Sequence, residues 1–360
     1  MKTTTTLIAA LGIAALASIS FVGCDSEPET GNNGFVGQVV DSVALAVADN
    51  LQEAARAPED TDVIEEVLLP ATDLAVTIYD PEFEPAVRDL LADGDTVYAI
   101  YDGALLVYDL TTDDYSLAVG DDALTTLVRH AGSIFAAGER LYRVDGAELI
   151  PDETEFNGRV KSLCSFDASL MIGTDCGLYA RNLLGTTLLL EDMDVSAMVA
   201  DREGLWIGTH GNGLFRWDGE EYRQRYLTRD ESLFDHVTAL AYNHDHVYLG
   251  TVNGMFVFDG GSWKTLTIED GLPGNVVTSL DATGWVVYVG TNAGMASFFD
   301  GEFSPVKSLE TQMITAIDRV EHNLFAGTVE DGIVLKSGPT VKTLMEPQLQ
   351  PEQGLAAVIH

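Results

Sequence analysis

The feature that most constrains the fold is an internal repeat that runs from about residue 85 to residue 346. Two neighbouring copies are the clearest. The first reads Val237-Thr-Ala-Leu-Ala-Tyr, Val247-Tyr-Leu-Gly-Thr and Gly254-Met-Phe-Val-Phe-Asp-Gly, and the second reads Val277-Thr-Ser-Leu-Asp, Val287-Tyr-Val-Gly-Thr and Gly294-Met-Ala-Ser-Phe-Phe-Asp-Gly. Each copy holds four short segments rich in β-branched and aromatic residues, a composition typical of strands. Asp-Gly pairs follow the third segment and predict a tight hairpin to the fourth.

The spacing of the copies predicts how many there are and how they assemble. A glycine followed by threonine marks the second strand of five copies, and two weaker copies upstream carry other residues there; the seven markers are Ile100, Ala137, Gly173, Gly208, Gly250, Gly290 and Gly327. The steps between them are 37, 36, 35, 42, 40 and 37 residues, the size of a four-stranded blade. Helical repeats need apolar residues at i, i+3, i+4 and i+7, which these segments lack. The sequence therefore predicts an all-β, seven-bladed β-propeller of four-stranded antiparallel blades over 85–346, which buries both faces of each sheet.

The first 23 residues have the pattern of a lipoprotein signal peptide. Lys2 is followed by the apolar run Leu7–Val22, whose sixteen residues are fewer than the roughly 20 that a spanning helix needs. Phe21-Val22-Gly23-Cys24 resembles the bacterial lipobox, which predicts lipidation of Cys24. Ordinary cleavage near Gly23, with Cys24 left as a thiol, is the alternative. The expected location is the bacterial cell envelope, with the chain anchored by lipid to the outer or the inner membrane.

Residues 24–84 separate this segment from the repeats. The stretch 25–34 is polar and acidic, as expected of a tether, and 36–56 has apolar residues spaced for an amphipathic helix. Leu74–Tyr79 predicts one strand, available to pair with the outer edge of the last blade. Residues 347–360 form a C-terminal tail.

Charge and cysteine content narrow the function classes. The chain has 57 acidic and 19 basic residues, a net charge of −38, which argues against nucleic-acid binding because phosphate recognition needs a basic surface. Beyond Cys24, only Cys164 and Cys176 are present. The repeat places Cys164 in a strand opposite about Met171, well short of Cys176, so free thiols are favoured over a disulfide between them.

Two stretches resemble a known repeat family. Gly204-Leu-Trp-Ile-Gly-Thr-His-Gly-Asn-Gly-Leu-Phe-Arg-Trp-Asp-Gly and Asp270-Gly-Leu-Pro-Gly-Asn-Val-Val-Thr-Ser-Leu are similar to the two-component regulator propeller repeat. The match is specific over 193–300, looser over 311–345 and faint over 85–192. The resemblance implies a seven-bladed propeller like those in the periplasmic sensor heads of hybrid histidine kinases, where paired propellers receive polysaccharide-derived signals. This chain departs from that pattern, with one propeller, no kinase and a lipid anchor, so only the scaffold is carried over.

Propeller topology predicts which loops share a face. If the first strand of each blade is innermost, the turns between second and third strands emerge beside the loops that join blades. The loops 228–236 and 268–276 are the longest of these, and binding residues tend to lie on loops of a rigid scaffold. Asn and Asp also stabilise tight turns, so a structural role is the competing interpretation. The candidate ligand-binding residues on this face are Tyr101, Arg140, Arg159, His210, Asn212, Asp235, His236, Asn253, Asn275 and Asn292.

Sequence motifs for catalysis or metal binding are weak. His244-Asp245-His246 falls in a hairpin turn on the opposite face with no third ligand, so no metal and no cofactor is expected. No GxSxG, HExxH or phosphate-loop pattern occurs. With 57 acidic residues, a catalytic carboxylate pair can be neither excluded nor located.

The sequence therefore predicts a non-catalytic cell-envelope lipoprotein whose propeller binds a ligand or a protein partner, with glycans among the candidates. Two alternatives stay open. One is a propeller enzyme, a polysaccharide lyase or hydrolase that uses carboxylates or histidine on the loop-rich face. The other is a structural component of an envelope assembly.

Overall fold

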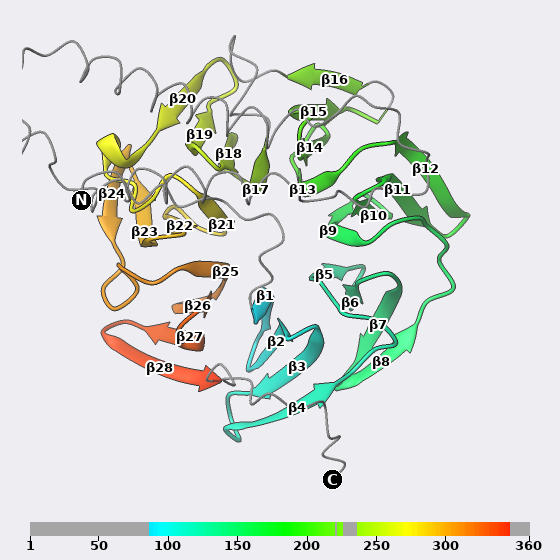
Figure 1. Cartoon of the computed structure of the whole chain (residues 1–360), viewed down its shortest axis with the longest axis horizontal. Helices are drawn as coiled ribbons and strands as arrows, with labels where there is room; N and C mark the ends of the chain where they lie inside the picture. The colour runs from blue at the N-terminus through cyan, green and yellow to red at the C-terminus, as the bar shows by residue number, and fades with distance from the viewer. Residues whose placement is uncertain (1–85, 220–221, 226–235, 346–360) are drawn as a thin grey trace, which may run out of the picture.

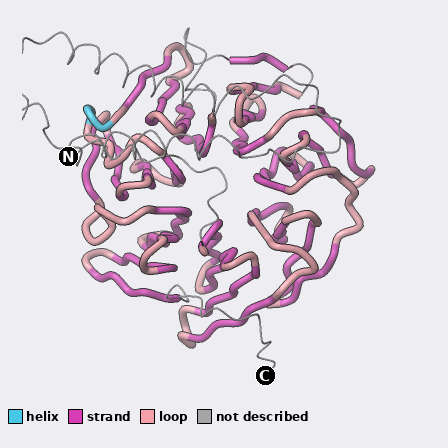
Figure 2. The backbone as a smooth tube through the Cα atoms, in the orientation of Figure 1, coloured by secondary structure: helices cyan, strands magenta, loops and turns pink. Residues whose placement is uncertain are grey.

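The computed structural model describes residues 86–219, 222–225 and 236–345. These residues form 28 strands and one short 3-10 turn, Ile268–Asp270, the single helical segment in Figure 2. The strands pair into seven separate four-stranded sheets arranged in a ring (Figure 1), which confirms the predicted propeller. The predictions for the signal peptide, the tether, the 36–56 helix, the Leu74–Tyr79 strand and the 347–360 tail lie outside the described residues.

Each blade is built from four consecutive strands. Blades 1 and 2 are β1 (Val87–Asp93), β2 (Thr96–Tyr101), β3 (Ala104–Asp109), β4 (Asp114–Ala118), β5 (Thr126–His130), β6 (Ser133–Ala137), β7 (Leu141–Asp145) and β8 (Glu148–Pro151). Blades 3 and 4 are β9 (Val160–Phe166), β10 (Ser169–Thr174), β11 (Gly177–Asn182), β12 (Gly185–Glu191), β13 (Val195–Ala200), β14 (Leu205–Thr209), β15 (Leu214–Trp217) and β16 (Tyr222–Arg225). Blades 5 to 7 are β17 (Val237–Asn243), β18 (His246–Thr251), β19 (Gly254–Phe258), β20 (Trp263–Leu266), β21 (Val277–Asp281), β22 (Val287–Thr291), β23 (Gly294–Phe299), β24 (Glu302–Pro305), β25 (Ile314–Val320), β26 (Asn323–Thr328), β27 (Gly332–Ser337) and β28 (Thr340–Met345).

The first strand of every blade lies innermost, which is the condition that the prediction of the loop faces required. β1, β5, β9, β13, β17, β21 and β25 surround the axis in Figure 1, and each contacts its two neighbours around the ring. Contact between β25 and β1 closes the circle. Within each sheet the strands follow chain order from the centre outward, so no described blade borrows a strand from the other end of the propeller.

Burial between blades holds the ring together. Seven hydrophobic clusters form, one at each interface, including that between blades 7 and 1. The marker glycines permit this packing, because an added Cβ on Gly208 would lie 2.3 Å from Cγ1 of Val237 in the next blade. Gly327 approaches Val87 in the same way at 2.5 Å, so the closing interface repeats the geometry of the others.

The cysteines follow the prediction in part. Cys164 lies in β9, pairs with Met171 in register and is a buried free thiol. Cys176 lies in the turn after β10 and is disulfide-bonded. The expectation of a free thiol is therefore wrong for Cys176, because strand register excludes only a bond to Cys164.

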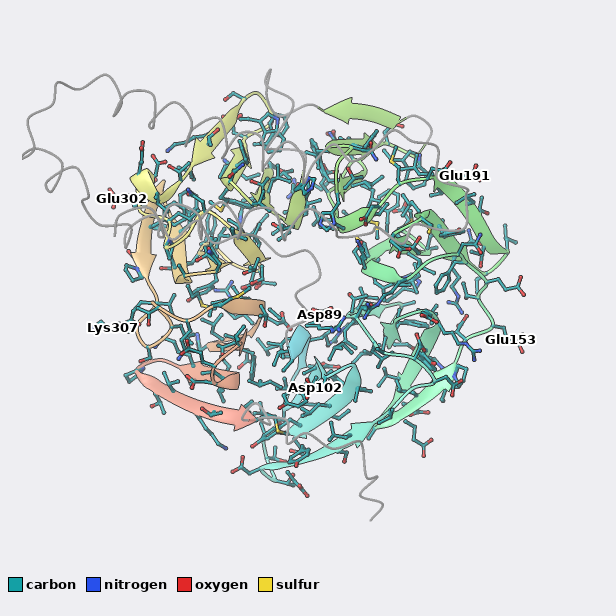
Figure 3. All side chains as sticks on the ribbon, viewed as in Figure 1. Asp89, Asp102, Glu153, Glu191, Glu302 and Lys307 are labelled. Atoms are coloured by element: carbon teal, nitrogen blue, oxygen red, sulfur yellow. The ribbon has the colours of Figure 1, made fainter. Side chains whose placement is uncertain are left out.

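Charged side chains gather on the outside of the ring. Figure 3 places Glu153, Glu191, Glu302 and Lys307 at the periphery and Asp89 beside the centre. In the described part of the chain, no helix is long and apolar enough to cross a membrane.

Candidate functional site

The turns between second and third strands do share a face with the loops that join blades. Backbone hydrogen bonds connect the two sets, from the N–H of Asp102 to the carbonyl of Ala86 at 2.7 Å and from the N–H of His210 to the carbonyl of Asp194 at 2.9 Å. We call this the loop-rich face. The opposite face carries the turns between first and second strands and between third and fourth strands, because the strands are antiparallel.

The Gly-Thr pair of the repeat stabilises a turn on this face. In blade 6, the buried hydroxyl of Thr291 donates to the carbonyl of Gly294 at 2.8 Å and accepts from the N–H of Ala293 at 3.2 Å. The threonine hydroxyl makes the equivalent pair of bonds in blades 3, 4, 5 and 7, at Thr174, Thr209, Thr251 and Thr328. These threonines are structural.

That comparison explains the position of Tyr101. In blade 1, Tyr101 occupies the site that the buried threonines occupy elsewhere, at the end of the second strand. It is 5% exposed and belongs to the hydrophobic cluster between blades 1 and 7. The structure therefore places Tyr101 in the core and not on the loop surface.

The predicted asparagines largely serve turns. The side-chain oxygen of Asn275 accepts from the N–H of Ile268 at 3.0 Å, and its carbonyl accepts from the N–H of Gly254 at 2.7 Å. The N–H groups of Asn212 and Asn253 donate to the threonines of their turns. Asn292 donates its N–H to Val276, and its buried Oδ1 has no hydrogen-bond partner among the described residues.

The two predicted arginines belong to neighbouring loops, since the N–H of Val160 donates to the carbonyl of Gly138 at 2.8 Å. Arg140 is exposed, pairs with Asp121 at 3.0 Å and lines an open groove of about 540 Å³ with Tyr179. The carbonyl of Arg159 accepts from the N–H of Asp175 at 3.1 Å. Asp235 lies outside the described residues.

Two predicted residues from different blades do meet. His210 follows β14 in blade 4 and His236 precedes β17 in blade 5, and their backbones form an isolated bridge. The two imidazole rings stack, with centroids 5.6 Å apart and an angle of 29° between their planes.

A half-buried carboxylate joins this pair to a third blade. Asp194 precedes β13 and lies 3.4 Å from Nδ1 of His210, and its Oδ2 accepts from Nζ of Lys161 on β9 at 2.7 Å. Burial alone would raise the pKa of Asp194, but the hydrogen bond and charge of His210 and the charge of Lys161 together hold that pKa below its usual value. The Oδ1 atom of Asp194 is buried without a hydrogen-bond partner among the described residues. Lys161, Asp194, His210 and His236 therefore form one polar cluster across blades 3 to 5.

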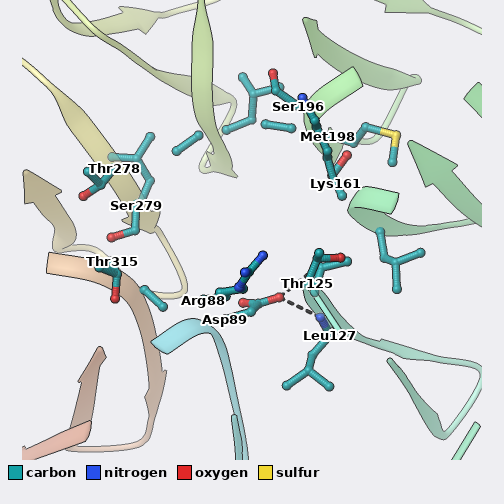
Figure 4. Close-up of a pocket in the computed structure, with 18 of the residues that line it drawn as sticks. Arg88, Asp89, Thr125, Leu127, Lys161, Ser196, Met198, Thr278, Ser279 and Thr315 are labelled. Atoms are coloured by element: carbon teal, nitrogen blue, oxygen red, sulfur yellow. Dashed lines mark hydrogen bonds between the residues drawn. The ribbon is translucent and has the colours of Figure 1, made fainter. Parts of the chain in front are cut away.

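The cluster lies beside the central channel. A cavity of about 280 Å³ is lined by residues of all seven innermost strands, Lys161 among them (Figure 4). Near the start of each innermost strand one residue occupies the same place, and in six blades it coincides with an irregularity in the pairing register. We call these seven positions the channel ring: Arg88, Thr125, Lys161, Ser196, Thr238, Thr278 and Thr315.

The hydroxyls of the channel ring connect neighbouring blades. Thr125 donates to the carbonyl of Val160 at 2.6 Å, and Ser196, Thr238 and Thr278 repeat this bond to the next blade at 2.5 to 2.6 Å. The hydroxyl of Thr315 is buried with no partner among the described residues. Blades 1 and 3 carry the cations Arg88 and Lys161 instead.

Asp89 connects blade 1 to blade 2 in another way. Its Oδ2 accepts from the N–H of Leu127 at 2.7 Å and from the hydroxyl of Thr126 at 2.9 Å, and its Oδ1 accepts from the N–H of Leu90. Burial raises the pKa of Asp89 to about 6. Since both oxygens are engaged, this carboxyl holds two blades together.

Sequence reasoning missed Arg88, Lys161 and Asp194. The signal was present, because aligning the strand starts Val277-Thr and Val237-Thr with Val87-Arg and Val160-Lys shows cations where other blades have hydroxyls. Contact with Asp194 depends on a separation of 33 residues and could not be read from spacing.

His244-Asp245-His246 lies in the hairpin between β17 and β18, as predicted. His244 and Asp245 both have positive φ, and Nδ1 of His246 contacts the carbonyl of His244 at 2.9 Å. In the part of the chain that the structure describes, no three His, Cys, Asp or Glu side chains are arranged to hold a metal ion.

Comparisons with known proteins identify the fold. No protein-family model and no curated protein matches the sequence. The structure is similar to the extracellular domain of a hybrid two-component system protein from B. thetaiotaomicron, with a TM-score of 0.60 and 12% identity over 71% of this chain and 39% of that chain. It is also similar to the computationally designed Ika8 protein, with a TM-score of 0.54 and 17% identity over 71% of this chain and 84% of that one. The WD40 repeats of RRP9 give a TM-score of 0.56 and 13% identity over 69% and 89%. At these identities the likeness concerns the propeller fold.

Proposed function

We propose that this chain is a non-catalytic lipoprotein of the bacterial cell envelope whose propeller binds a ligand or protein partner on the loop-rich face, at the channel mouth beside blades 3 to 5. The observation that carries the proposal is the polar cluster of Lys161, Asp194, His210 and His236. Four titratable side chains from three blades meet there at the surface of a rigid scaffold.

Comparison between blades supports a binding role for the cluster. Asp194 and His236 occupy the place directly before the innermost strand, where blades 6 and 7 have Val276 and Met313. The backbone of this position pairs with the neighbouring turn in several blades, so its side chain is not needed for the turn itself. Polar groups at dispensable positions point to recognition and not to packing.

The likeness to a two-component system's extracellular domain is compatible with a role in binding. We propose that the repeats belong to the two-component regulator propeller type, and that the partner is an envelope protein or a glycan.

Affinity measurements would test the site. The double variant His210→Ala with His236→Ala should weaken capture of a partner from detergent-solubilised envelope, or of a glycan from an array, by at least tenfold. His322→Ala is the matched control, because His322 is exposed in the turn between β25 and β26 on the opposite face. Unchanged affinity of the double variant would place the site elsewhere. Absence of any envelope partner or glycan would reject the binding role.

The lipid anchor needs a separate test. Cys24→Ser should abolish labelling by a fatty-acid analogue and release the protein from membranes, and unchanged labelling would reject the assignment. The disulfide bond of Cys176 provides a chemical check. Because Cys164 is a free thiol, a thioether-linked lipid on Cys24 requires the partner of Cys176 to belong to another molecule. Mass spectrometry that found Cys24 and Cys176 bonded to each other would also reject lipidation.

A further inference from the structure

The outer strand of blade 1 exposes an apolar stripe that the other blades lack. Tyr115 and Leu117 on β4, and Val119 directly after it, are 46%, 51% and 69% exposed. Among the other outer strands whose side chains the structure describes, β12 and β28 each expose one large apolar side chain, Leu188 and Val341, and β8, β20 and β24 expose none. We call Tyr115, Leu117 and Val119 the β4 stripe.

Strand pairing places the stripe on the side of β4 that faces blade 7. Tyr115 pairs in register with Tyr108, and Leu117 pairs with Leu106; both partners are buried in the hydrophobic cluster between blades 7 and 1. Side chains at directly paired positions lie on the same face of a sheet, and Val119 continues the alternation. Among the described strands, β4 pairs with β3 alone, so its outer edge offers backbone groups to a further strand.

The stripe lies beside the interface at which the ring closes. Six of the seven interfaces join blades that are consecutive in the chain, so the chain itself links them, whereas blades 7 and 1 are the last and the first. Lys342 on β28 forms an ion pair with Asp113, directly before β4, and its Nζ lies 5.9 Å from the ring centroid of Tyr108. The outer strands of the two blades are therefore neighbours, and the β28 arrow points at blade 1 in Figure 1.

The C-terminal tail, residues 347–360, follows directly from this interface. Leu344 and Met345, the last two described residues, belong to the same hydrophobic cluster as the partners of the stripe. Ten residue steps separate Met345 from Leu355 and span up to about 33 Å when extended, while the five residues of β4 are about 17 Å long. The tail can therefore reach any part of β4. Residues 1–85, by contrast, continue into β1 at the centre of the ring.

The tail also has a segment of suitable composition. Leu355–Ile359 is a run of five apolar residues after the last proline, Pro351, so each of its residues has a backbone N–H to donate. Leu355, Ala357 and Ile359 lie at alternate positions, as the residues of the β4 stripe do. In an added strand, these three side chains would share one face of the sheet with the stripe.

We propose that residues 355–359 bind the outer edge of β4 as a fifth strand of blade 1 and cover the β4 stripe. The contact links blade 7 to blade 1 by the chain itself, which supplies the connection that the closing interface lacks. It also covers a strand edge that would otherwise be open to pairing with other chains. This contact lies at the rim of the propeller, so it is independent of the binding site proposed on the loop-rich face.

Hydrogen–deuterium exchange of the full chain, measured by mass spectrometry, tests the contact from both sides. In the wild-type protein, the peptide covering 355–359 should exchange at least tenfold more slowly than a synthetic peptide of the same sequence. Leu117→Ser should remove that protection, and Leu355→Ser with Ile359→Ser should speed exchange of the peptide covering β4 several-fold. The matched control is Leu183→Ser, at a fully exposed leucine in the turn between β11 and β12, which should leave both peptides within twofold of wild type.

Each side of the experiment can overturn the proposal. Exchange of 355–359 as fast as in the synthetic peptide, or protection that survives Leu117→Ser, would show that the tail does not bind the stripe. Unchanged exchange of β4 in the tail variant would do the same, and this arm holds even if Leu117→Ser impairs folding, because the tail changes lie outside the propeller strands. Protection that appears only at high protein concentration would assign the stripe to a second copy of the chain and would also overturn the proposal.

Discussion

Gly250→Ala should destabilise the propeller through a single contact between blades 5 and 6. A Cβ added to Gly250 lies 2.6 Å from Cγ1 and 3.0 Å from Cβ of Val277, and 3.3 Å from Oγ1 of Thr238. Val277 is fully buried at the start of the next innermost strand, so movement of an exposed side chain cannot relieve the overlap.

The size of the effect follows from two opposing contributions. Overpacking of this kind costs about 1–3 kcal/mol. Replacing glycine by alanine lowers the entropy of the unfolded chain and returns about 0.4–1 kcal/mol. The net loss of unfolding free energy should be about 1–2 kcal/mol, or roughly 2–8 °C in the thermal midpoint for a domain of this length. Thermal and urea unfolding followed by circular dichroism would measure it.

Two further variants separate the contact from glycine chemistry in general. Gly261→Ala places its Cβ 3.6 Å from the nearest atom, Oδ1 of Asp259, and should change stability by less than about 0.5 kcal/mol. Val277→Ala removes Cγ1, so combining it with Gly250→Ala should cost about 1 kcal/mol less than the sum of the single changes. A Gly250→Ala protein as stable as wild type, or strictly additive losses, would refute the packing argument.

Three other outcomes can be measured on the same protein. Burial raises the pKa of Asp89 from 3.8 to about 6, so between these pH values the folded state binds a proton that the unfolded state has lost. The resulting contribution to the unfolding free energy, about 3 kcal/mol, is complete below pH 4 and is lost as the pH rises to 6. The unfolding free energy should therefore depend less on pH in Asp89→Asn than in the wild-type protein. With a net charge of −38, the thermal midpoint should rise from dilute buffer to about 0.5 M salt, and a flat or falling midpoint would show that the acids are locally compensated. Burial raises the pKa of the Cys164 thiol to about 11, so iodoacetamide should modify Cys164 only after denaturation, and rapid labelling of the native protein would contradict this.

The fold could be predicted almost completely because the same local sequence signals recur from blade to blade. Asp-Gly hairpins, the Gly-Thr turn and alternating β-branched residues act over a few positions, and seven copies average out the weak ones. The prediction also holds for the two weaker copies, since Ile100 and Ala137 lie in second strands as the marker glycines do. The burial of Tyr101 was not predicted, although Tyr101 follows the marker Ile100 at the place where five other blades have a buried threonine, because the strand topology predicted that place to lie on the loop surface.

For the candidate site, the strand topology predicted which loops share a face but not which side chains are in contact. Antiparallel strands dictate which loops share a face, and this brought His210 and His236 into the same candidate set. Which residues touch across that face depends on the angle between blades and on side-chain reach. Lys161 contacts Asp194, 33 residues later, because β9 and β13 are neighbours in the ring. Asn275 lies in the predicted loop, yet its side chain closes a turn.

The seven blades also act as internal controls for separating structure from function. Where most blades agree, as at the buried threonines after the marker glycines, the shared hydrogen bonds account for the residue and no ligand is needed. Where a blade has a different residue at a position whose side chain makes a hydrogen bond in the other blades, that hydrogen bond is lost. The fold alone then does not explain the choice of residue. Asp89 accounts for one such departure, since it joins blades 1 and 2 beside Arg88. Its carboxylate explains how blade 1 holds its neighbour without the hydroxyl, but it does not explain why a guanidinium replaces it. The same reasoning applies to Lys161, whose neighbour Ser162 donates to the carbonyl of Val195 at 3.3 Å and so connects blade 3 to blade 4. In both blades the structural bond has moved one residue along the strand, and the ring position is left for a cation that faces the channel.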